Sequence, residues 1–128
     1  MNNKSNLIFL YLIENKRTFG AFIKAKLNDI NLKGSRKYYK DENAFAFSFD
    51  TNKIYKILVP PNAIAFDSKY YIFIGNNGNG NGFYFSQNKM YDKQLINGAK
   101  IYDFSKNNEL CENFEKLTEL EIFEVNFK

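Results

Sequence analysis

The chain has 128 residues, a formal net charge of +4 and a charged fraction of 25%, which indicate one folded domain rather than a disordered tail. It contains no histidine and a single cysteine, Cys111. These counts exclude a His-based triad, a histidine metal ligand or pH switch, an internal disulfide and a thiolate zinc site. The longest apolar run, residues 7–13, is too short to span a bilayer and lacks the flanks of a signal peptide.

Alternation of large and small side chains gives the strongest structural signal. Residues 44–49 have the sequence Ala-Phe-Ala-Phe-Ser-Phe, so an extended strand places Phe45, Phe47 and Phe49 on one face. We expect this aromatic face to enter a core between two sheets. Further strands are predicted at residues 6–14, 18–26, 53–59, 70–75, 82–87, 100–104 and 120–127, with tight turns at residues 14–17 and 50–52.

Helix signals are scarce. Residues 107–120 carry Leu110, Phe114 and Leu117 at helical spacing, which predicts one short helix. Many short strands separated by turn residues indicate an all-β protein, a sandwich or a barrel. We see no repeat or linker, and therefore treat residues 1–128 as a single domain.

A glycine-rich segment joins two of the predicted strands and contains Gly75, Gly78, Gly80 and Gly82. Glycine tolerates a positive φ, so this loop can bend tightly. No Gly-Lys-Ser/Thr follows it and no helix begins after it, which weighs against a phosphate-binding loop. A structural loop between strands is the favoured interpretation.

A basic cluster follows the second predicted strand. It consists of Lys33, Arg36, Lys37 and Lys40, interleaved with Tyr38 and Tyr39. Lysines with stacking aromatics suit single-stranded nucleic acid, and residues 1–64 carry 11 basic side chains against 5 acidic ones. Against this, only two of the basic residues in the chain are arginines, the side chain that binds phosphate bidentately. Anchoring of the tyrosines in the fold is the favoured interpretation.

Other chemically active side chains have no visible activating partner. Cys111 lies near Glu109, Glu112 and Glu115, whose charges favour the protonated, inert thiol. Asp41 and Glu42 are adjacent and point to opposite faces of a strand, so a solvated turn is expected. The six carboxylates between residues 109 and 124 favour a solvated helix face over a docking site.

Four motifs in order resemble the TLDc domain of oxidation-resistance proteins. They are Phe19-Gly20-Ala21-Phe22, Tyr38-Tyr39 followed by Ala44-Phe45-Ala46-Phe47, Ile74-Gly75 through Gly82-Phe83-Tyr84-Phe85, and Phe123-Glu124-Val125. The chain departs from the family at Asn43, where the family has Glu, and at Asn126, where it has Trp. TLDc domains usually begin some tens of residues earlier, so the chain resembles a shortened or divergent copy, or a fragment.

The resemblance implies a two-sheet antiparallel β-sandwich with one or two short helices, in a cytoplasmic protein linked to oxidative-stress resistance. It also implies a cytosolic protein partner, for several family members the vacuolar proton-pumping ATPase, and brings no settled catalytic residue. We therefore expect a non-catalytic binding module without a metal or other cofactor. Gly75, Gly78, Gly80, Gly82 and Glu124 are the predicted partner contacts, because they carry the best matches. The alternative is a basic nucleic-acid-binding β-domain using Lys33, Arg36, Lys37 and Lys40.

Overall fold

Antiparallel strands make up most of the structure. The computed structural model describes residues 4–14, 16–27, 37–66, 72–75, 82–86, 89–93, 101–103, 110 and 115–126. Within these residues the elements are β1 (Leu7–Ile13), β2 (Thr18–Ile23), β3 (Lys37–Tyr39), β4 (Phe45–Ser48), β5 (Lys53–Lys56), the 3-10 turn η1 (Pro60–Asn62), β6 (Ile64–Phe66), β7 (Ile72–Ile74), β8 (Gly82–Ser86), β9 (Lys89–Lys93) and β10 (Glu115–Glu124).

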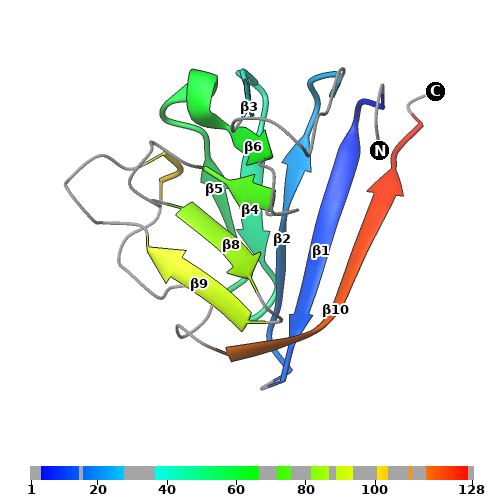
Figure 1. The fold of residues 1–128 in the computed structure, drawn as a ribbon, viewed down its shortest axis with the longest axis vertical. Coiled ribbons are helices and arrows are strands. Elements are labelled where there is room, and N and C mark those ends of the chain that lie inside the picture. Colours follow the sequence, from blue (N-terminus) through cyan, green and yellow to red (C-terminus); the bar gives the residue numbers. More distant parts are fainter. Residues whose placement is uncertain are drawn as a thin grey trace.

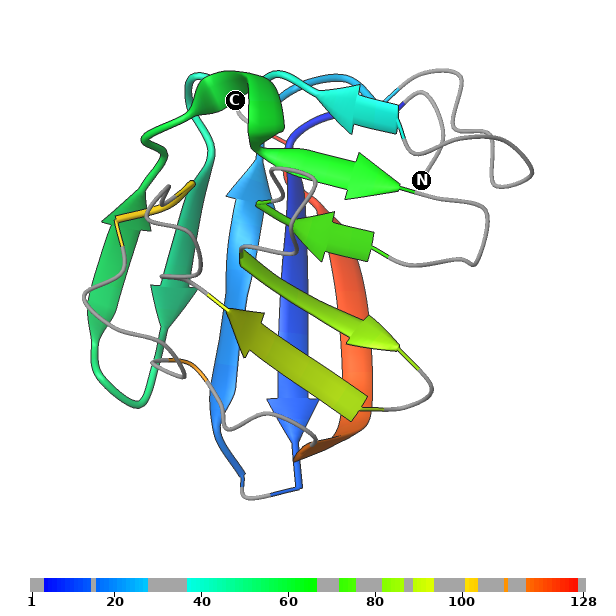
Figure 2. The ribbon, with the colours of Figure 1, turned by 60° about the vertical axis from the view of Figure 1, so that its left-hand side comes forward.

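The strands form two layers that share one strand. Hydrogen-bonded neighbours follow the order β3-β6-β7-β8-β9-β10-β1-β2-β4-β5. Strands β10, β1, β2, β4 and β5 make one sheet, and β3 and β6 to β9 make the sheet that faces it (Figures 1 and 2). The predicted two-sheet antiparallel sandwich is therefore confirmed.

Strand β10 joins the two sheets. Its first residues, Glu115 and Lys116, pair with β9, and the remainder pairs with β1 (Figure 1). A register shift in the β1–β10 ladder lies beside this change of partner, and the Thr118 hydroxyl donates to the carbonyl of Leu12 across 2.8 Å. Such irregularities bend a strand, which allows it to serve both layers.

The helix predicted at residues 107–120 is wrong where the structure describes it, because residues 115–120 belong to β10. The spacing of Leu117 and Leu120 suits a helix in isolation. Pairing along β1 supplies a long ladder of backbone hydrogen bonds, however, and this tertiary contact outweighs local helical spacing.

An aromatic cluster fills the space between the layers. The rings of Tyr11 and Phe19, from neighbouring strands of one sheet, stack with centroids 5.6 Å apart. Phe83 from the facing sheet meets both rings edge-on, at 5.5 and 5.6 Å. All three side chains are fully buried, so this cluster connects the two sheets.

The orientation predicted for β4 is wrong, although its alternation is right. Ala44, Ala46 and Ser48 are buried, whereas Phe45 and Phe47 are half-buried and Phe49 is 66% exposed. Alternation shows only that the two faces of a strand differ. The inner layer already holds the rings of Tyr11, Phe19 and Phe83, so the small face of β4 turns inward.

Both predicted turns are confirmed, and they join antiparallel neighbours. Lys16, between β1 and β2, has φ 71°, and Asn52, between β4 and β5, has φ 56°. The strand predicted at residues 100–104 is wrong over residues 101–103. There the structure has only an isolated bridge between Ile57 and Tyr102. Strands β3, β6 and β9 were not predicted.

Candidate functional site

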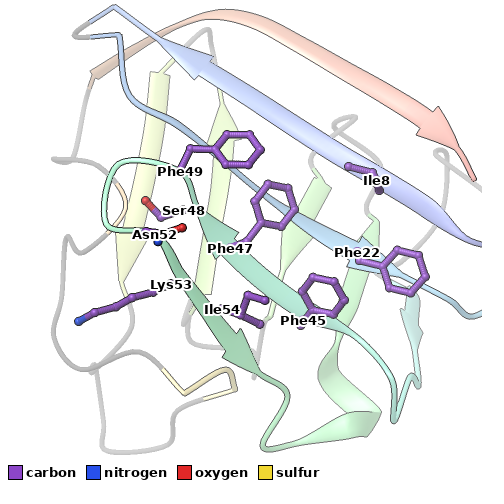
Figure 3. Close-up of a pocket in the computed structure, with 9 residues that line it drawn as sticks. All are labelled: Ile8, Phe22, Phe45, Phe47, Ser48, Phe49, Asn52, Lys53 and Ile54. Atoms are coloured by element: carbon purple, nitrogen blue, oxygen red, sulfur yellow. The ribbon is translucent and has the colours of Figure 1, made fainter.

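The outer face of the β10-β1-β2-β4-β5 sheet carries a row of aromatic rings. Phe22 on β2 stacks on Phe45 of the neighbouring β4, with ring centroids 5.3 Å apart. Phe45 and Phe47 follow at 6.4 Å, and Phe47 and Phe49 at 5.4 Å. Figure 3 shows Phe45, Phe47 and Phe49 following one another along β4, with Phe22 beside Phe45 on the neighbouring strand. The three phenylalanines of the β4 segment share this face because alternate residues of a strand point to the same side.

Aliphatic side chains extend this surface, which we name the outer aromatic face. Its members are Ile8, Phe22, Phe45, Phe47, Phe49 and Ile54, which line one shallow groove of about 360 Å³ together with Ser48, Asn52 and Lys53 (Figure 3). Ile54 is 72% exposed. No element among the described residues covers this face. A continuous apolar surface of this kind on a folded chain usually marks an interaction site.

The two edges of this face carry opposite charges. On the β10 side, Glu119 and Glu121 flank a smaller cleft of about 190 Å³ with Leu10, Leu12 and Thr18. A side-chain hydrogen bond with Glu119, and next the charge of Glu119, raise the pKa of Glu121. On the β5 side, the exposed Lys56 lies on the same face as Ile54, whereas Lys53 pairs with the buried Ser48 and has the opposite orientation. Apolar rings between a carboxylate edge and a lysine edge suit recognition of another protein.

The predicted glycine site is only partly described. Gly75 directly follows β7 with φ 78°, is buried, and donates its N–H to the carbonyl of Ala63 across 2.9 Å. A Cβ added there would lie 3.1 Å from both Ile101 and Tyr102, so glycine serves packing at this position. Gly82 begins β8, while Gly78 and Gly80 lie outside the described residues.

Glu124 ends β10 in the other sheet, paired with Leu7 on β1, and its carboxylate lies 3.7 Å from the ammonium group of Lys4. The structure therefore places Glu124 in a different sheet from Gly75 and Gly82. A partner-binding role for these residues stays a prediction.

Half of the predicted basic patch is described. The Lys37 ammonium lies 5.2 Å from the ring centroid of Tyr39, and the Lys40 ammonium lies 3.3 Å from a carboxylate oxygen of Glu42. Both contacts are local. Lys33, Arg36 and Cys111 lie outside the described residues, so the nucleic-acid alternative stays a prediction.

Asp41 is a structural carboxylate rather than the solvated residue we expected. It is 4% exposed and accepts hydrogen bonds from the backbone N–H groups of Lys24 at 2.6 Å, Ala25 at 3.0 Å and Asn43 at 2.8 Å. These bonds tie the end of β2 to the turn before β4. The carboxylate is fully used in holding backbone.

No group of three or more acidic or cysteine side chains is placed to hold a metal ion in the described part of the chain. Over the same residues, no helix is long and apolar enough to cross a membrane.

The sequence contains a signal for the outer aromatic face that our prediction did not use. Every residue of β1 from Leu7 to Ile13 is apolar. A strand with one face in water normally alternates apolar and polar residues. A strand that is apolar throughout has two apolar faces, and both favour contact with other apolar groups. Ile8, Leu10 and Leu12 therefore mark the outer face of the sheet as apolar.

Together these features define a two-sheet antiparallel β-sandwich with an exposed apolar face on one layer. The sequence model of the TLDc domain matches residues 1–126, and the chain belongs to this family. No curated protein matches the chain.

Proposed function

We propose that the chain is a non-catalytic protein-binding module of the cytoplasm that acts in resistance to oxidative stress. The observation that carries the proposal is the row of rings in which the half-buried Phe22, Phe45 and Phe47 lead to the exposed Phe49. Exposed aromatic side chains are enriched at protein interfaces because they bury much area with little loss of conformational freedom. Membership of the TLDc family supports the link to oxidative stress.

We further propose a subunit of the vacuolar proton-pumping ATPase as a partner, as the resemblance to the family implies. The test is a pull-down from cytosolic extract, with antibodies against the ATPase subunits as the readout. Replacing Phe49 and Ile54 together by serine should lower capture at least tenfold, because both side chains are exposed on the outer aromatic face. Tyr38→Ser is the matched control, since Tyr38 is exposed on the opposite sheet.

Three outcomes would contradict the proposal. Equal capture by the double variant and the wild-type chain would show that the outer aromatic face does not bind the partner. Retention of nucleic acid instead, with an affinity that falls steeply with salt, would favour the basic nucleic-acid-binding domain. Turnover of peroxide by the repurified chain would show that it is an enzyme.

A further inference from the structure

We draw no further inference here: the strongest candidate, the outer aromatic face of the β10-β1-β2-β4-β5 sheet, belongs to the site already described, and nothing among the described residues shows what covers it.

Discussion

The ring of Phe47 lies directly over Gly20 on the neighbouring strand. The two residues are paired across β2 and β4, and a Cβ on Gly20 would come within 2.9 Å of the Cζ atom of Phe47. The same Cβ would collide with the carbonyl oxygen of Phe9 on β1. The glycine of the Phe-Gly-Ala-Phe segment therefore allows β1 and β2 to approach closely and the Phe47 ring to pack over it on the outer face.

Substitution of this glycine should destabilise the fold. Gly20→Ala is expected to lower the free energy of unfolding by about 3 kcal/mol, because the added methyl group overlaps backbone and ring atoms. Urea denaturation measures the change. Adding Phe47→Ala to the same chain should recover only part of the loss, since the collision with the Phe9 carbonyl remains. Full recovery would contradict the close approach of β1 and β2.

Core and outer phenylalanines should differ strongly in their contribution to stability. Phe19→Ala removes a fully buried ring and should cost about 3–5 kcal/mol. Phe49→Ala removes a ring that is 66% exposed and should cost less than about 1 kcal/mol. Chemical denaturation of the two variants gives the comparison. Equal losses would show that the outer rings face a core, as the alternation alone had led us to expect.

The carboxylate of Asp41 should contribute more to stability than its exposed neighbour. Asp41→Ala leaves the N–H groups of Lys24, Ala25 and Asn43 without their acceptor and should cost about 3–5 kcal/mol. Asp41→Asn should cost less, because its single carbonyl oxygen can still accept from Lys24 and Ala25. Glu42→Ala is the control and should change stability by less than about 0.5 kcal/mol. Similar melting temperatures for all three variants would exclude the anchoring role.

Two buried tyrosines should make the fold sensitive to alkali. Burial raises the pKa of Tyr11 above its ordinary value of 10.0, and burial, then Asp41, then Tyr11 raise that of Tyr102. The neutral phenols therefore stabilise the folded state fully below pH 10. This contribution is lost above pH 10, where the unfolded chain gives up these protons more readily than the folded chain.

Replacing each tyrosine by phenylalanine distinguishes the contributions of the two hydroxyl groups to stability. Tyr102→Phe removes the hydrogen bond of 2.9 Å to the Ala63 carbonyl and should cost about 1–2 kcal/mol at neutral pH. The Tyr11 hydroxyl has no hydrogen-bond partner among the described residues, so Tyr11→Phe should be close to neutral. Tyr11→Phe should also lose less stability between pH 9 and pH 11 than the wild-type chain. Thermal melts at each pH measure this loss. An alkaline loss of stability in Tyr11→Phe equal to that of the wild-type chain would contradict this account.

The sequence was informative about strands and much less so about faces. Asparagine and lysine residues between the strands predicted the turns at residues 14–17 and 50–52. These turns could be predicted because a residue in the left-handed backbone conformation, such as Asn52, closes a hairpin locally. The direction in which Phe45 and Phe47 point depends on the volume left by residues far away in the sequence. The conformation of β10 also depends on a distant segment. The spacing of its leucines suits a helix, but pairing with β1 makes it a strand.

The candidate site was missed for a related reason. A glycine-rich loop attracts attention in a sequence, whereas an apolar outer face becomes visible only when strands from distant segments lie side by side. Ile8, Phe22, Phe47 and Ile54 come from four strands and share one surface through cross-strand pairing. The unbroken apolar sequence of β1 was the one signal we find in the sequence that indicates this surface.

The most direct test of partner binding through the outer aromatic face is a site-specific photo-crosslink. A photoreactive phenylalanine at position 49 should form adducts with a subunit of the vacuolar ATPase in cytosolic extract. The same group at position 38, on the opposite sheet, should form few. Adducts that arise equally from both positions, or only from position 38, would contradict the account.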